Sequence, residues 1–239
     1  GTISPVIEGL RMTGGDANGL RGHPWATGTD AGGAVYVLSA TVTITNNGIS
    51  SSTASFGGGI YFQHSHGTFH GNEVTANTGH WGGGLYARDS HMTIRDNLFA
   101  QNQVAGWTPG EDTYPNRGAG LDIGERSGAE LSGNIITYNT SEDCGGGLAL
   151  TSDGDITISN NEISANTAVT GGGLFLRGTS AALVSNTIYA NTAITSGGGL
   201  YLLDSRAVIQ NNDIISNAAQ SGSGGGVNAS GPGNGFAQD

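Results

Sequence analysis

Residues 197–202 read GGGLYL, and variants of this hexapeptide return along almost the whole chain. The other copies are GGAVYV (32–37), GGGIYF (57–62), GGGLYA (82–87), GAGLDI (118–123), GGGLAL (145–150), GGGLFL (171–176) and GGGVNA (224–229). Successive copies begin 25, 25, 36, 27, 26, 26 and 27 residues apart. A nearly constant period of this length indicates one supersecondary unit that is stacked about eight times.

The composition agrees with a repeat architecture. Glycine provides 44 of the 239 residues and only 11% of the residues are charged, which differs from an ordinary helical or α/β domain. Because the glycines recur at the repeat period, they indicate turns and not a flexible linker. We therefore expect one continuous solenoid over residues 1–239, in which each unit contacts mainly its neighbours.

Apolar residues form three columns in each unit. The first column occupies alternate positions after the glycines, as Leu174 and Leu176 do, and alternation places both on one face of a strand. The second and third columns flank an asparagine, as Ile44 and Ile49 flank Asn47. A second asparagine follows five residues later in most units. Stacked asparagines can hydrogen-bond from coil to coil, and asparagine tolerates the left-handed conformation that a tight bend needs.

These columns predict an all-β fold, a right-handed, single-stranded parallel β-helix. Three consecutive glycines cost a helix about 1 kcal/mol each, and the units lack the two-residue turns of β-hairpins. Three strands per coil, each pairing with its equivalent one coil later, satisfy every column, and the crossover rule makes the coil right-handed. We expect about eight coils of 25–27 residues: an irregular first coil at 1–31, regular coils at 32–226 with an insertion at 106–117, and a tail at 227–239. The abrupt start suggests a fragment or a processed product.

The paired motifs resemble a known repeat family. Gly-Gly-apolar units combined with apolar-x-x-Asn are similar to the repeats of bacterial polymorphic outer-membrane proteins and of the wider right-handed β-helix repeat family. The strict Phe-x-x-Asn form occurs at Phe69–Asn72, whereas Ile or Leu replaces Phe elsewhere. The resemblance implies an extracellular or cell-surface location and a structural or adhesive module. It also implies an alternative, because the family includes polysaccharide lyases and glycoside hydrolases.

Charge limits the partners. The formal net charge is −11 and the chain has no lysine, so nucleic acid is not an expected partner. No stretch reaches the roughly 18 apolar residues that a membrane span needs, so we expect no membrane insertion.

A polysaccharide or other copies of the chain are the expected partners. Self-assembly would use the open strand edges at the solenoid ends. The single cysteine, Cys144, excludes an intrachain disulfide.

The longest interval between repeats, together with the coils beside it, contains the candidate site. Its insertion has the sequence GWTPGEDTYPNR, and loops that depart from a regular scaffold often contain binding groups. If the chain is an enzyme, its site is expected in the groove near 86–130. The candidate catalytic residues are Arg88, Asp89, His91, Asp122, Glu125 and Arg126. The absence of lysine excludes any mechanism of the family that needs a lysine base, and the paired-aspartate and Gly-His-Gly signatures of polygalacturonase-like hydrolases are missing.

Aromatic residues suggest a surface that contacts a ligand. Outward aromatic residues on a flat sheet can stack on sugar rings or contact another protein, although they are also good strand formers. The candidate ligand-binding residues are Tyr61, Tyr86, Trp107 and Tyr114.

Histidines suggest a metal site. His66 and His91 share a repeat register, as do His64 and Asp89, so each pair is expected one strand spacing apart. Imidazole and carboxylate groups of this kind can bind a transition metal, although surface histidines at turns are common. Acidic turns can also hold calcium. No other cofactor is predicted.

Overall fold

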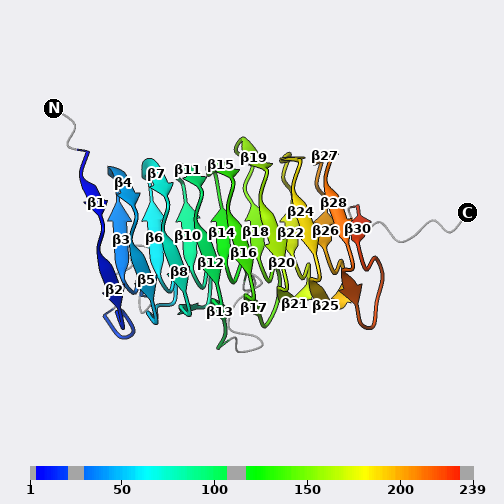
Figure 1. Ribbon diagram of the computed structural model, residues 1–239, viewed down its shortest axis with the longest axis horizontal. Coiled ribbons are helices and arrows are strands. Elements are labelled where there is room, and N and C mark those ends of the chain that lie inside the picture. The colour runs from blue at the N-terminus through cyan, green and yellow to red at the C-terminus, as the bar shows by residue number, and fades with distance from the viewer. Residues whose placement is uncertain (1–3, 21–29, 107–116, 232–239) are drawn as a thin grey trace, which may run out of the picture.

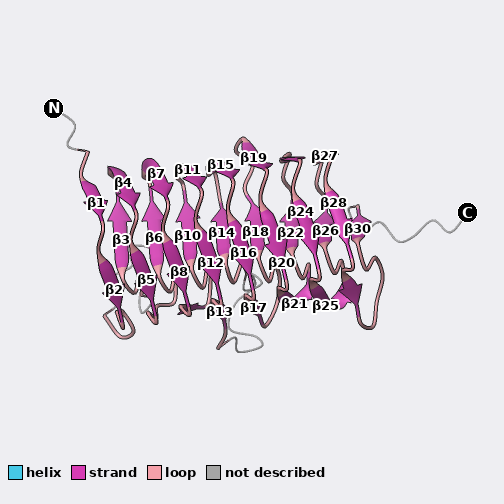
Figure 2. Cartoon of the chain, in the orientation of Figure 1, coloured by secondary structure: helices cyan, strands magenta, loops and turns pink. Residues whose placement is uncertain are grey.

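The computed structural model describes residues 4–20, 30–106 and 117–231, and these form a solenoid of parallel strands (Figure 1). The colour in Figure 1 runs from blue to red along the long axis, so consecutive coils lie side by side. The described residues contain strands and loops but no helix (Figure 2), and therefore no helix that could span a membrane. The predicted all-β solenoid is confirmed.

The strands form four sheets, and all their pairings are parallel. Sheet 1 follows the glycines and contains β3 (Val35–Leu38), β6 (Ile60–Gln63), β10 (Leu85–Arg88), β14 (Leu121–Gly124), β18 (Leu148–Thr151), β22 (Leu174–Arg177), β26 (Leu200–Leu203) and β30 (Val227–Ser230). Sheet 2 contains β1 (Val6–Glu8), β4 (Thr41–Thr45), β7 (His66–His70), β11 (His91–Arg95), β15 (Gly128–Ser132), β19 (Ile156–Ser159), β23 (Ala182–Val184) and β27 (Val208–Gln210).

Sheet 3 contains β2 (Arg11–Thr13), β5 (Gly48–Ser50), β8 (Glu73–Thr75), β12 (Leu98–Ala100), β16 (Ile135–Thr137), β20 (Glu162–Ser164), β24 (Thr187–Tyr189) and β28 (Asp213–Ile215). Sheet 4 contains β9 (Thr78–Gly79), β13 (Gln103–Val104), β17 (Thr140–Ser141), β21 (Thr167–Thr170), β25 (Thr192–Ser196) and β29 (Ala218–Ala219). Strands β1 and β2 pair with the next coil and β30 pairs with β26. The regular coils therefore extend beyond the expected limits of residues 32 and 226.

Sheet 4 was not predicted. The sequence suggested three strands per coil because only three columns are aliphatic. The inward positions of sheet 4 are instead small or variable, for example Val104, Ser141, Ala168 and Ala193, and all four are buried. Because such residues do not form a recurring aliphatic column, the fourth strand leaves no periodic signal in the sequence.

The three aliphatic columns fill the interior of the solenoid, as predicted. Leu85, Leu121, Leu148 and Leu174 lie in register in sheet 1 and have no exposed surface. Burying each such side chain contributes about 1.5–3 kcal/mol. One coil cannot offset its loss of conformational entropy in this way, but a stack of coils can.

The glycine triplets are required by the entry into sheet 1. Gly82 has a φ of 64°, and a Cβ there would lie 2.5 Å from the backbone oxygen of Leu85. A Cβ at Gly84 would lie 2.5 Å from the backbone oxygen of Gly120 and 3.1 Å from the side chain of Asn102. The first glycine therefore turns the chain, and the third lets neighbouring coils approach closely.

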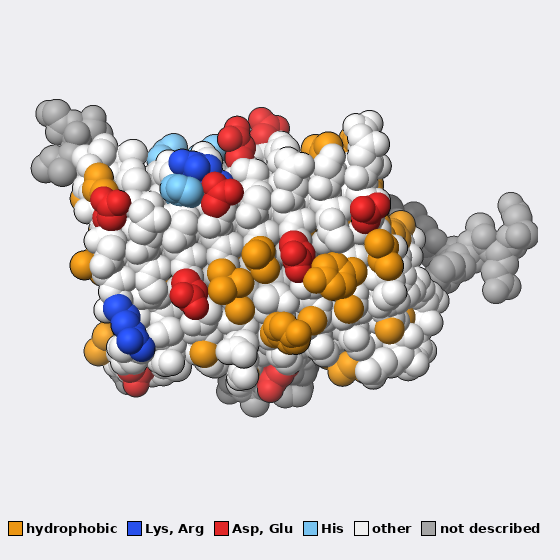
Figure 3. Space-filling view, viewed as in Figure 1, with side chains coloured by type: hydrophobic (Ala, Val, Ile, Leu, Met, Phe, Trp, Pro, Cys, Tyr) orange, Lys and Arg blue, Asp and Glu red, His pale blue; other side chains and the backbone are white. Residues whose placement is uncertain are grey.

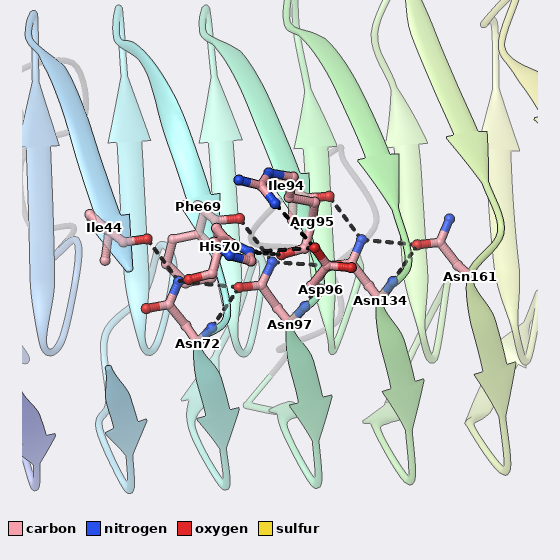
Figure 4. A network of polar contacts seen from close by, with 10 residues as sticks. All are labelled: Ile44, Phe69, His70, Asn72, Ile94, Arg95, Asp96, Asn97, Asn134 and Asn161. Carbon is pink, nitrogen blue, oxygen red and sulfur yellow. Dashed lines mark hydrogen bonds and ion pairs between the residues drawn. The ribbon is translucent and has the colours of Figure 1, made fainter. Parts of the chain in front are cut away.

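Two buried rows of asparagine connect the coils, which confirms the predicted stacking. In Figure 4, Asn72, Asn97, Asn134 and Asn161 follow one another along the solenoid. The amide nitrogen of Asn97 donates to Oδ1 of Asn134 at 2.9 Å and to the backbone oxygen of Phe69 at 2.9 Å. The second row includes Asn77, Asn102, Asn139, Asn166 and Asn191. These hydrogen bonds satisfy amide groups that would otherwise be costly to bury.

The bends use a different residue from the one expected. The row asparagines do not have a positive φ. The residue before each of them does, as Asp96 (55°), Asn160 (53°) and Ala165 (53°) show. This left-handed residue turns the chain so that the following asparagine points inward, where it can stack on its equivalents.

Candidate functional site

The turn after sheet 1 brings together four predicted catalytic residues and His64. His64, Asp89, Glu125 and Arg126 all have a positive φ, between 29° and 50°. Asp89 is central, since Oδ1 lies 2.6 Å from Nε of Arg126 and Oδ2 lies 3.6 Å from Nε2 of His64. Arg88 lies 3.6 Å from Asp89 through Nε and 2.6 Å from Glu125 through Nη2. We call these five residues the turn cluster.

The charges of the turn cluster largely compensate each other. Two arginines face two carboxylates, and the Asp89 side chain is only 8% exposed. A general base needs a free carboxylate within reach of substrate, whereas Asp89 is surrounded by cationic partners. The cluster spans three coils, so its geometry favours a role in connecting them.

Asp122 lies apart from the turn cluster, in a buried group on the outer face of sheet 1. Its Oδ2 is 3.4 Å from Nε of Arg117, and the two side chains are 0% and 6% exposed. The Arg117 guanidinium also lies 5.0 Å from the ring centroid of Trp81. Within the described residues, both Asp122 carboxylate oxygens and the Tyr86 hydroxyl have no hydrogen-bond partner. Desolvation raises the pKa of Asp122 to about 6, against the opposing effect of Arg117.

His91 also lies outside the turn cluster, because it stacks on His66. The ring centroids are 5.4 Å apart and the ring planes differ by 9°. Their residues are partners in β11 and β7, so the predicted one-coil spacing is confirmed. A Cβ at residue 128 would lie 2.7 Å from Cδ2 of His91, so Gly128 makes room for this ring.

The metal candidates form two pairs, His64 with Asp89 and His66 with His91. In the part of the chain that the structure describes, no three His, Cys, Asp or Glu residues are grouped closely enough to hold a metal ion.

Tyr61 and Tyr86 are not accessible in this structure, which corrects the expectation that they offer an exposed platform. Both have no exposed surface, although they do lie on the outer face of sheet 1. Their ring centroids are 5.3 Å apart, and Phe56 contacts both rings. Aromatic residues pack there in a second apolar layer. The other two ligand-binding candidates, Trp107 and Tyr114, lie outside the described residues.

The sequence did not identify the accessible apolar surface on the outer face of sheet 3. On this face Ile135, Tyr189 and Ile215 are 44%, 37% and 52% exposed, and Tyr138, in the turn directly after β16, is 66% exposed. Figure 3 shows hydrophobic side chains gathered over the region labelled β16, β20, β24 and β28 in Figure 1. We call these four residues and Glu162 the sheet 3 patch. Comparing the residues at equivalent outward positions of sheet 3 would have revealed this patch, because the earlier coils have the polar or small residues Arg11, Gly48 and Glu73 at those positions.

A family model described as a right handed beta helix region matches residues 26–109 and 80–237. The chain belongs to this family. Comparisons with curated proteins and with solved structures find no match.

Membership of the right-handed β-helix family confirms the predicted fold, including the direction of winding. The family is defined by this repeated coil, and the same fold hosts unrelated functions. The function of this right-handed β-helix must therefore be argued from its own surface.

Proposed function

We propose that this right-handed β-helix is a structural or adhesive module of a secreted or cell-surface protein, and that it acts by binding. The observation that carries the proposal is the exposed sheet 3 patch on a scaffold whose coils are connected by two asparagine rows. Exposed apolar patches rimmed by polar residues are typical of interaction sites. The resemblance of the repeats to those of polymorphic outer-membrane proteins supports the surface location.

A binding assay combined with a cleavage assay tests this function. The purified chain would be incubated with immobilised neutral and acidic polysaccharides, and reducing ends and unsaturated products would be measured with and without calcium. We expect retention on at least one polysaccharide without cleavage. Cleavage that Glu125→Gln or Asp122→Asn abolishes, in variants with an unchanged circular dichroism spectrum, would contradict a purely adhesive function.

One observation favours the alternative, a polysaccharide lyase or glycoside hydrolase. A carboxyl group with a pKa of about 6, such as that of Asp122, can serve as a general acid near neutral pH. Its 0% exposure argues against this function, because a catalytic acid must reach the scissile bond. The cleavage assay above decides between the two functions.

A further inference from the structure

The outer face of sheet 3 changes character along the solenoid. Its first outward column is Arg11, Gly48, Glu73, Leu98, Ile135, Glu162, Thr187 and Asp213. Its second is Thr13, Ser50, Thr75, Ala100, Thr137, Ser164, Tyr189 and Ile215. Polar residues predominate in the first three coils, and large apolar residues appear only from β12 onwards. Backbone pairing needs no such change, since every coil pairs in the same way.

Away from the first coil, outward aromatic residues differ in exposure between sheet 1 and sheet 3. On sheet 1, Tyr61 and Tyr86 are 0% exposed and Phe175 is 3% exposed, whereas Tyr36 in the first coil of that sheet is 39% exposed. Tyr189 on β24 stays exposed beside Ile215, and Tyr138, in the turn directly after β16, stays exposed in the same coil as Ile135. Leaving them in water forgoes the stabilisation that burial provides on sheet 1.

Hydrogen-bonding groups lie between these apolar side chains. The Tyr189 hydroxyl donates to Oε1 of Glu162 at 2.7 Å, and the hydroxyls of Thr137 and Ser164 lie 3.0 Å apart. Because they project from paired strands, these groups repeat at the strand spacing of about 4.8 Å. The face over β16, β20, β24 and β28 therefore presents apolar side chains together with hydrogen-bonding groups, although Ser164 itself is only 3% exposed.

This combination matches a sugar polymer better than a protein partner. A sugar ring offers an apolar C–H face that packs on aromatic rings, and its hydroxyls can donate hydrogen bonds to Glu162. A protein that covered Glu162 would have to pair or desolvate its charge at a considerable cost. Glu73 and Asp213 lie on the same face of a chain with a net charge of −11, so a polyanion would be repelled.

We propose that the sheet 3 patch binds an uncharged polysaccharide, whose chain lies across β16, β20, β24 and β28. Tyr138 and Tyr189 stack on sugar rings, and Glu162 accepts hydrogen bonds from sugar hydroxyls. This inference rests on the proposed binding function and names its ligand class and residues. A shallow depression lined by Arg11, Ser50, Glu73 and Thr75 continues the face toward the N-terminal coils.

Affinity electrophoresis and titration calorimetry test the site. The probes are a neutral β-glucan, a galactomannan and polygalacturonate, each with the whole chain. We expect binding to at least one neutral polymer and weaker or no binding to polygalacturonate. Tyr138→Ala combined with Tyr189→Ala should lower the affinity at least about tenfold, a loss of about 1.4 kcal/mol. Glu162→Gln should weaken binding without changing the melting temperature by more than a few degrees.

Tyr36→Ala is the matched control, because Tyr36 is a 39% exposed tyrosine on sheet 1. It should bind as the unchanged chain does. Neutral-polymer binding that survives the double tyrosine substitution would overturn the site while leaving an adhesive function intact. No binding to either neutral polymer, or preferential binding to polygalacturonate, would overturn the ligand class. Self-association in light scattering that the double substitution abolishes would show that the patch is an interface between copies, and would also overturn the proposal.

Discussion

The carboxylate of Asp122 lies 3.4 Å from the guanidinium of Arg117, and both side chains are buried against the outer face of sheet 1. Arg117 precedes the short turn that leads into β14 (Leu121–Gly124), and Asp122 is the second residue of that strand. The pair is an ionic contact inside an otherwise aromatic layer.

We predict a strongly non-additive double-mutant cycle for this pair. Removing one partner leaves an unpaired buried charge, so Arg117→Met or Asp122→Leu alone should lower the free energy of unfolding by about 3–5 kcal/mol. The double substitution should recover most of that loss, because no charge is left buried. Urea denaturation of all four proteins measures the coupling, and additive losses would show that the contact is not an energetic pair.

The raised pKa of Asp122 predicts a pH dependence of stability. The carboxyl pKa is about 6 in the folded chain and 3.8 ordinarily, so the folded chain binds this proton more tightly. The contribution of the Asp122 carboxyl to the free energy of unfolding is therefore largest below about pH 4 and is lost as the pH rises through about 6. A shift of this size corresponds to about 3 kcal/mol.

Comparison with Asp122→Asn isolates that contribution from the other titrating groups. The stability difference between the unchanged chain and the variant should fall by about 2 kcal/mol between pH 4 and pH 7. A difference that stays constant over this range would mean that the Asp122 carboxyl has an ordinary pKa.

The asparagine rows should be far more sensitive than their neighbours. Asn161→Ala removes an amide that donates to Asn186 and Leu131 and accepts from Asn134, so we expect a loss of about 3 kcal/mol or more. Asn160→Gly is the control, since residue 160 is exposed with a φ of 53° and glycine adopts that conformation readily. In thermal unfolding, the melting temperature of Asn161→Ala should be clearly lower than that of Asn160→Gly. Equal effects would refute the role assigned to the row.

An alanine-to-glycine change should stabilise the chain at a bend. Ala165 has a φ of 53°, and a left-handed conformation costs a non-glycine residue about 1–2 kcal/mol. Ala165→Gly should therefore raise the free energy of unfolding by about 1 kcal/mol, after the entropy that glycine adds to the unfolded chain. Ala168→Gly, at a buried strand position, should lower it. Destabilisation by both changes would argue against the assigned bend.

The sequence predicted the periodic parts of the fold. The inward leucines and isoleucines and the asparagine rows repeat with every coil, so their stacking could be inferred from spacing alone. Sheet 4 could not, because residues such as Ser141 and Ala168 are buried there without an aliphatic pattern.

Accessibility on the outer faces could not be predicted in the same way. Tyr86 and Tyr189 both sit at outward strand positions, yet Tyr86 is 0% exposed and Tyr189 is 37% exposed. The difference depends on what packs over each sheet, and a strand period carries no information about that. The partial grouping of the predicted catalytic residues has a similar cause: Asp89 and Arg126 meet at one turn, whereas Asp122 points from a strand toward Arg117.

Chemical-shift mapping of the isotope-labelled chain during titration with a neutral oligosaccharide tests the central claim most directly. We predict that perturbed signals cluster on the outward residues of β16, β20, β24 and β28, including Tyr189, and on Tyr138 in the turn after β16. Perturbations centred on the turn cluster around Asp89, or none with any neutral oligosaccharide, would contradict a binding function located on sheet 3.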